Sequence, residues 1–144
     1  MQLFPRIAIV AAVTLVTASA LAACSTGSAT PAEEPPLVAE PIGGTDIQRL
    51  TLTESAAERL NIQTATVEVA GDGRVVPSAA VIIDTTGTYW VYTNPEPLVF
   101  VRHEIGPVRE EGLKAFFVNG PETGTSVVTI GVPELYGAEF GIGK

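Results

Sequence analysis

The pattern of apolar and polar positions divides the chain into an apolar N-terminal run, a proline-rich segment and a β-patterned region. The first part, residues 7–16, reads IAIVAAVTLV. From about residue 47 onward, short runs rich in Val, Ile, Thr and aromatic residues alternate with clusters of Gly, Pro, Asn and Asp. Such runs, separated by turn residues at regular spacing, are typical of antiparallel strands. The predicted strands cover residues 64–69, 74–84, 88–93, 98–103, 114–118 and 126–130, with a turn at 94–95.

Two short helices are expected within the β-patterned region. Thr53 can cap a helix over residues 54–60, and Asn61 is placed to end it in the left-handed conformation. A second helix is expected over residues 134–136, before a flexible tail at 137–143. We therefore predict an all-β fold, a small antiparallel β-barrel or sandwich with one or two short helices.

The N-terminal run has the length and the ending of a bacterial lipoprotein signal peptide. Ten apolar residues are too few for a membrane-spanning helix, which needs about 20. The run closes on Leu21-Ala22-Ala23-Cys24, which resembles the lipobox of bacterial lipoproteins. The resemblance implies a diacylglyceryl group on the Cys24 thiol and cleavage before that residue, and two acyl chains give stable anchoring. The alternatives are an uncleaved anchor helix and a conventional signal peptide cut at Ala20 or Ala23, and both leave Cys24 as a free thiol.

The segment between this signal and the β-patterned region has little apolar material to bury. Residues 25–46 contain four prolines and the Gly43-Gly44 pair. Such a composition cannot offset the entropy cost of ordering, so an extended flexible tether is expected. The predicted organisation is a lipoprotein signal peptide at 1–23, a lipid-anchored flexible tether at 24–46 and a β-rich domain at 47–144.

Composition and charge exclude several function classes. The 144 residues include 8 basic and 16 acidic side chains, a net charge of −8. Removal of residues 1–23 takes away only Arg6, which leaves 7 basic against 16 acidic groups, or −9. A chain this acidic does not hold a phosphate backbone by counterion release, so nucleic acid is not expected as a partner. One Cys and one His cannot form a Cys/His zinc site, and no metal or cofactor is expected.

A series of short motifs follows a recognisable order between about residues 50 and 135. Its members are Leu52-Thr53, Leu60-Asn61-Ile62, Val76-Pro77, Ala80-Val81, Gly87, Trp90-Val91-Tyr92, Gly124, Val127-Val128, Gly131 and Leu135. Their shared order resembles the membrane-proximal domain of periplasmic adaptor subunits, the membrane fusion proteins of efflux systems. In that family a long insertion with a β-barrel, a lipoyl-like domain and a helical hairpin separates the two halves of the domain. Here a tight turn within residues 69–74 bridges them, which implies a reduced domain that keeps a membrane-side contact module.

No motif in the sequence supports catalysis. Paired acids need environments that separate their pKa values, and nothing in the sequence places an acid in an apolar cleft. The residues considered as catalytic acids or as a pH-sensitive contact are Asp84, Glu104, Glu110, Glu111 and His103. We expect the acids to lie in solvated loops and the histidine at the surface end of a strand. The chain is therefore not expected to be an enzyme.

Phe116 and Phe117 are the best candidates for contact with a partner. Neighbours on a strand face opposite ways, so one ring fills the core and the other is available for contact.

These features predict an exported, lipid-anchored protein of the cell envelope. Its β domain would make protein contacts at the outer face of the membrane, with an efflux transporter as the candidate partner. The alternative is a small-molecule or ion-binding lipoprotein that feeds a transporter. One Met and one His argue against carriage of a soft metal ion.

Overall fold

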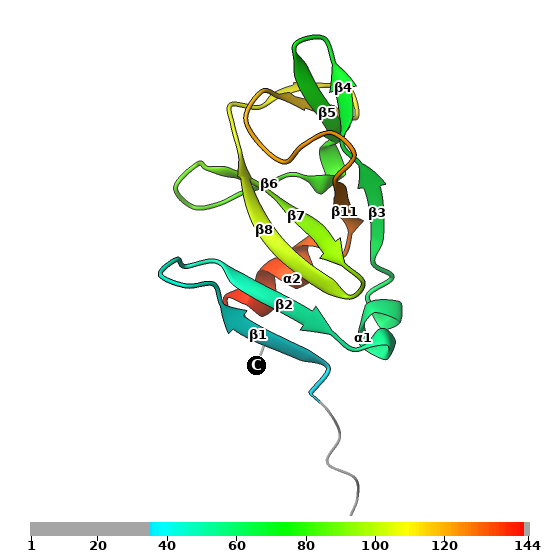
Figure 1. The fold of residues 1–144 in the computed structure, drawn as a ribbon, viewed down its shortest axis with the longest axis vertical. Helices are drawn as coiled ribbons and strands as arrows, with labels where there is room; N and C mark the ends of the chain where they lie inside the picture. Colours follow the sequence, from blue (N-terminus) through cyan, green and yellow to red (C-terminus); the bar gives the residue numbers. More distant parts are fainter. Residues whose placement is uncertain (1–34, 143–144) are drawn as a thin grey trace, which may run out of the picture. The chain divides into compact units, whose positions relative to one another are not determined.

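Two antiparallel sheets and two α-helices form the part of the chain that the structure describes, which is residues 35–142 of a computed structural model (Figure 1). The strands of the larger sheet are β1 (Leu37–Pro41), β2 (Gln48–Leu52), β3 (Gln63–Thr66), β6 (Ile82–Ile83), β7 (Tyr89–Glu96), β8 (Val99–Ile105) and β11 (Ser126–Ile130). Their order is β1-β2-β8-β7-β11-β3, with β6 paired to β7. The predicted all-β class with short helices is confirmed.

The smaller sheet packs on one face of the larger one. Its strands are β4 (Glu68–Ala70), β5 (Gly73–Pro77), β9 (Arg109–Glu111) and β10 (Lys114–Phe117), in the order β4-β5-β10-β9. A tight turn joins β4 to β5, since Ala70 pairs with Gly73. The hairpin expected within residues 69–74 is therefore present.

Two hydrophobic clusters lie on opposite faces of the larger sheet. Tyr92 and Val128 belong to the cluster that includes residues of both α-helices. Their chain neighbours Val91 and Val127 belong to the cluster shared with the smaller sheet. Successive residues of a strand point to opposite faces, so β7 and β11 are buried on both sides. This double burial explains their continuous runs of apolar residues.

The first helix, α1 (Glu54–Arg59), matches the sequence prediction closely. The Thr53 side chain accepts a hydrogen bond from the backbone N–H of Ala56 at 3.3 Å, as a capping residue does. Asn61 follows the helix with a φ of 49°, the left-handed conformation expected there. Local chemistry sets both ends of α1.

The second helix, α2 (Val132–Glu139), is longer than predicted, because it continues through Gly137. The expected stop at 136 and the flexible tail from 137 are wrong. Leu135 and Glu139 are buried, and their packing offsets the cost of about 1 kcal/mol for a glycine inside a helix. The left-handed glycine that ends the helix is Gly141, with a φ of 67°.

Three other sequence predictions need correction. The run at 64–69 divides into β3 and β4, which belong to different sheets, and the run at 74–84 divides around a 3-10 turn, η1 (Ser78–Ala80). The expected turn at 94–95 lies within β7, where the pairing with β8 shifts register between Thr93 and Glu96. A chain that crosses from one sheet to the other retains its β-branched composition, so these breaks leave little trace in the sequence.

The predicted tether at 24–46 extends too far along the chain. Within it, residues 37–41 form β1 and pair with residues 48–52 of β2 in antiparallel register. The Gly43-Gly44 pair belongs to the turn of this hairpin, where the backbone N–H of Ile42 donates to the carbonyl of Ile47 at 3.0 Å. One of the prolines that suggested a flexible segment, Pro41, thus lies in an edge strand. Proline is tolerated in an edge strand.

Candidate functional site

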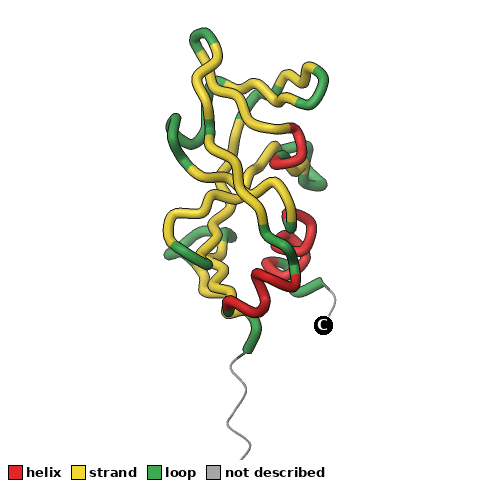
Figure 2. The backbone as a smooth tube through the Cα atoms, turned by 90° about the vertical axis from the view of Figure 1, so that its right-hand side faces the viewer, coloured by secondary structure: helices red, strands yellow, loops and turns green. Residues whose placement is uncertain are grey.

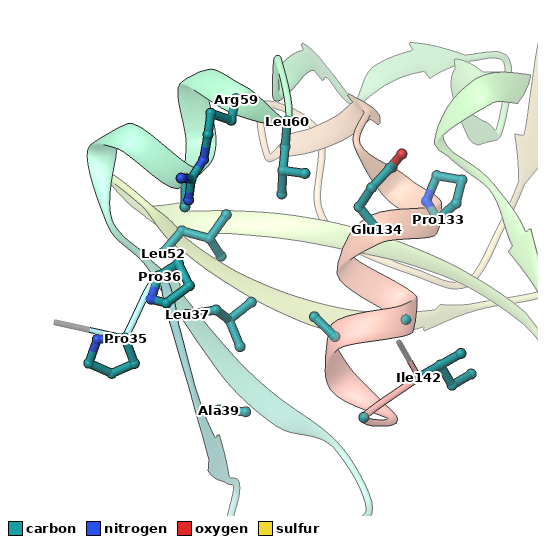
Figure 3. A pocket seen from close by; sticks show the side chains of 14 residues that line it. Pro35, Pro36, Leu37, Ala39, Leu52, Arg59, Leu60, Pro133, Glu134 and Ile142 are labelled. Atoms are coloured by element: carbon teal, nitrogen blue, oxygen red, sulfur yellow. The ribbon is translucent and has the colours of Figure 1, made fainter. Parts of the chain in front are cut away.

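An apolar groove lies between β1, α1 and α2 (Figure 3). Figure 2 shows these helices near the end of the fold where the described chain begins. Its volume is about 950 Å³. The lining residues are Pro35, Pro36, Leu37, Ala39, Leu52, Ala56, Arg59, Leu60, Pro133, Glu134, Gly137, Ala138, Gly141 and Ile142. Apolar and small side chains predominate, so the groove can accept an apolar surface.

Strand β1 forms one wall of the groove. Leu37 and Ala39 line it because alternate residues of a strand share one face. The register of β1 places Leu37 opposite Leu52, which also lines the groove. The carbonyl of Pro36 accepts a hydrogen bond from the backbone N–H of Thr53 at 3.1 Å. The chain therefore enters the fold along the groove, fixed to the residue that caps α1.

Helix α2, with Gly141 and Ile142 beyond its end, forms the opposite wall. Gly137, Ala138 and Gly141 present little or no side chain to the groove, whereas Ile142 is 68% exposed at its edge. A wall of small residues allows another backbone to approach closely. This side of the groove is therefore smooth, with one projecting aliphatic side chain.

Two charged side chains lie among the apolar residues of the groove. Arg59, the last residue of α1, and Glu134, in the first turn of α2, are both exposed. Figure 3 shows them on either side of Leu60. Within residues 35–142 neither side chain forms an ion pair. Each is available to a charge that approaches the groove.

Glu139 holds α2 in its place against the larger sheet. Its carboxylate accepts hydrogen bonds from the Tyr92 hydroxyl at 2.5 Å and from the backbone N–H of Gln48 at 3.2 Å. The Gln48 side chain in turn donates to the Glu139 carbonyl oxygen at 2.6 Å. Because Gln48 begins β2, the partner of β1, these bonds join the two walls of the groove. Burial, with the hydrogen bond to Glu139, holds the pKa of Tyr92 well above its usual 10.0, so the phenol remains a donor.

Arg102 supplies the positive charge beside Glu139. Its Nε lies 3.3 Å from Glu139 Oε1 and its Nη2 lies 3.7 Å from Asp46 Oδ2, and the side chain is 2% exposed. The guanidinium lies 4.1 Å from the ring centroid of Trp90 and 5.0 Å from that of Phe140. Two aromatic rings and a buried carboxylate offset part of the cost of removing this charge from water. The contacts of Nε and Nη2 with the carboxylates are ion pairs, since neither nitrogen has a hydrogen-bond partner within the described residues.

Asp84 organises the turn between β6 and β7. Its carboxylate accepts hydrogen bonds from the Thr86 hydroxyl at 2.6 Å, from the Thr88 backbone N–H at 3.0 Å and from the Trp90 indole N–H at 2.9 Å. The hydrogen bond from the Thr86 side chain is the largest of the effects that hold the pKa of Asp84 well below its usual 3.8. The carboxylate is thus fully engaged in shaping the turn, which also fixes the indole that contacts Arg102.

Phe116 and Phe117 point to opposite faces of β10, as alternation along a strand requires. Phe117 is 3% exposed and belongs to the core cluster between the sheets. Phe116 is half-buried on the other face, where the Arg109 guanidinium lies 4.8 Å from its ring centroid. Because its ring is buried, Phe117 is not a contact residue for a partner. Phe116 stays a prediction for contact with a partner.

The other predicted site residues do not converge on a common centre. Cys24 and the lipobox residues Leu21, Ala22 and Ala23 lie outside the described residues. Within residues 35–142 no group of three or more His, Cys, Asp or Glu side chains could hold a metal ion. Glu104, Glu110 and Glu111 are exposed, but they lie on β8 and β9 and not in the loops expected for them. Glu111 forms an ion pair with Arg109, two residues earlier on β9.

Sequence reasoning missed the groove and Glu139. The groove combines residues from both ends of the domain, and no local pattern relates them. Glu139 did carry a signal, because it follows Val132 and Leu135 at the i+7 and i+4 positions of one helix face. An acid on the apolar face of a helix requires buried partners.

Within the described residues no helix has the length and hydrophobicity to cross a membrane. Comparison with protein-family models, with curated proteins and with solved structures finds no match to this chain.

Proposed function

We propose that this chain is a lipid-anchored, non-enzymatic protein of the cell envelope. Its β domain makes protein contacts at the outer face of the membrane, as an accessory to an efflux transporter. The observation that carries the proposal is the apolar groove at the point where the chain enters the fold. The lipobox and the motif order that resembles adaptor subunits support it from the sequence.

The length of the preceding chain keeps this groove close to the membrane. Eleven residue steps separate the lipidation site Cys24 from Pro35 at the groove (35 − 24 = 11). An extended chain spans at most about 3.6 Å per residue, so the groove lies within about 40 Å of the lipid. Proteins embedded in the same membrane are therefore within reach.

A dye-efflux assay tests the proposal in cells that lack this chain. We expect the deletion to increase retention of efflux substrates, and the wild-type chain to restore the wild-type level. Ile142→Asp, which places a charge at the groove, should fail to restore it. Val69→Asp is the matched control, because Val69 is 67% exposed, against 68% for Ile142, but lies in the smaller sheet. Unchanged retention in the deletion strain would refute the efflux role.

A second candidate function is the binding of a small apolar molecule. The observation in its favour is the groove volume of about 950 Å³, which is within the range of about 300–1,000 Å³ usual for ligand sites. Native mass spectrometry of the purified lipoprotein would distinguish the two. A bound molecule that Ile142→Asp releases and Val69→Asp retains would favour this second function.

A further inference from the structure

We propose that the groove receives an amphipathic helix of a membrane-embedded protein, with an acidic residue that pairs with Arg59 and a basic residue that pairs with Glu134. This inference deepens the proposed function and depends on it. Three features of the groove carry it. These are its concave form, its two charges that form no ion pair within residues 35–142, and its position beside the start of the described chain.

The concave form favours a helix over a lipid surface. A bilayer surface is flat and docks on apolar side chains that project from a protein. Here the apolar side chains of Leu37, Leu52 and Leu60 line a hollow between two helices and a strand (Figure 3). A helix with apolar residues at i, i+3, i+4 and i+7 fills such a hollow.

An added β-strand is a poorer occupant than a helix. No strand among residues 35–142 pairs with the outer edge of β1, but Pro36 precedes this strand and Pro41 ends it. Proline has no N–H and cannot donate to a neighbouring strand, so an incoming strand could pair with only a short stretch of this edge. Side-chain packing within the groove therefore offers more contact than main-chain pairing beside it.

The charges argue against anionic lipid and for a partner with both signs of charge. The chain without residues 1–23 carries a net charge of −9 (7 basic against 16 acidic groups), so an anionic leaflet repels it. Arg59 and Glu134 provide one positive and one negative site at the groove, on either side of Leu60. A helix with the complementary pair of charges can bind in only one orientation.

The position of the groove limits where the helix comes from. Residues that precede Pro35 connect the groove to Cys24 within about 40 Å, as derived above. A segment that lies at the surface of the same membrane meets the groove without displacement of the lipid anchor. A helix adjacent to a membrane span, with one apolar face, has these properties.

Photo-crosslinking in native cells, followed by charge exchange, tests the occupant. The full chain would carry a photoreactive phenylalanine analogue in place of Ile142, and tandem mass spectrometry would map the crosslinked peptide. We expect a segment of a membrane protein with apolar residues at helical spacing and both an acidic and a basic residue. Arg59→Glu should lower the crosslink yield by about fivefold, as expected for the loss of a partly shielded ion pair. Reversal of the partner's acidic residue to Lys should then restore the yield.

Two control variants with matched charge changes distinguish a local contact at the groove from the effect of an altered net charge on the whole domain. Glu134→Lys should lower the yield as Arg59→Glu does. Lys114→Glu changes the net charge by the same amount as Arg59→Glu, and Glu110→Lys by the same amount as Glu134→Lys, but Lys114 and Glu110 lie in the smaller sheet. Each control should leave the yield within about twofold of the wild type. Both groove side chains are exposed, but each charge complements the dipole of its helix. Reversal of either charge should therefore lower the melting temperature by no more than a few degrees.

The contradictory outcomes are separable from those of the proposed function. Crosslinks to phospholipid, to a second copy of this chain or to a peptide without the two charges would overturn the helix as occupant. An undiminished yield in Arg59→Glu would overturn the charge pairing, while crosslinks to a membrane protein would still support the proposed function. The absence of any crosslink from position 142 would overturn both.

Discussion

Glu139 and Arg102 form a charged pair that water does not reach, and the position of α2 depends on it. The two side chains are 0% and 2% exposed. Removal of one member of such a pair leaves an uncompensated charge in the interior, which costs far more than removal of both. The hydrogen bonds from Tyr92 and Gln48 add to the same anchor point. One residue thereby determines how far apart the walls of the groove lie.

Glu139→Leu should destabilise the domain by about 3–5 kcal/mol, because it leaves Arg102 buried without its nearest carboxylate. The double variant Arg102→Leu/Glu139→Leu should lose less stability than Glu139→Leu alone. Urea titration of the single and double variants measures the difference. A double variant that is less stable than Glu139→Leu would contradict the description of this contact as an ion pair.

Asp84 should make stability depend on pH in the acidic range. The folded pKa lies below the unfolded value near 3.8, since hydrogen bonds from Thr86, Trp90 and Thr88 favour the carboxylate. The contribution is therefore complete above the unfolded pKa and is lost as the pH falls below about 4. The stability advantage of the wild type over Asp84→Asn should shrink between about pH 5 and pH 2. An advantage that is independent of pH would exclude this carboxylate as the cause.

Phe116 and Phe117 should differ clearly in their effect on stability. Phe117→Ala removes a buried ring from the core between the sheets and should cost about 3–5 kcal/mol. Phe116→Ala removes a half-buried ring and its contact with Arg109, which amounts to about 1 kcal/mol or less. Denaturant titration of both variants gives the comparison. Equal large losses would mean that both rings support the core.

Local residue chemistry could be predicted, whereas distant contacts could not. Thr53 and Asn61 determine the ends of α1 through contacts with their own neighbours, and the sequence predicts both. Glu139 and Gln48 are 91 positions apart, and no local pattern indicates their contact. The groove depends on such contacts, which explains why it was visible only in the structure.

The elements that escaped prediction are the ones that packing determines. Strand β1 exists because its residues pair with β2, although its composition is that of a linker. Helix α2 extends past Gly137 because Leu135 and Glu139 are buried against the sheet. In both places tertiary contacts outweigh local propensity. The strands with the clearest patterns, β7, β8, β10 and β11, were predicted because each is a short run of β-branched or aromatic residues between turn residues.

The junction between β11 and α2 depends on a glycine. Gly131 has a φ of 93°, and a Cβ at this position would collide with the Cδ1 of Ile62. Gly131→Ala should therefore lower the free energy of unfolding by about 1–3 kcal/mol, because the positive φ strains any other residue and the end of the Ile62 side chain must move. Gly124→Ala is the control, because its φ of 91° is similar but no atom lies within 4 Å of the added Cβ. If thermal unfolding showed equal losses of stability in the two variants, backbone strain would be the whole cause and contact with Ile62 would contribute nothing.

As a whole, the described domain is organised as three packed layers with the groove at one end. The larger sheet lies between the two helices and the smaller sheet, and each interface has its own cluster of buried residues. The groove lies on the helix side, where the chain enters from the proposed lipid anchor. We therefore expect the helix side of the domain to meet membrane proteins, with the smaller sheet directed elsewhere.

The most direct test of this account is the yield of crosslinks from the groove with and without the lipid anchor. A photoreactive residue at position 37, which lines the groove, would be compared in the wild-type chain and in Cys24→Ser, with position 69 in the smaller sheet as the reference. We expect position 37 to crosslink a membrane protein in the anchored chain and to lose most of this yield in Cys24→Ser. Equal yields with and without Cys24, or crosslinks from position 69 alone, would contradict an anchored protein that makes its contacts through the groove.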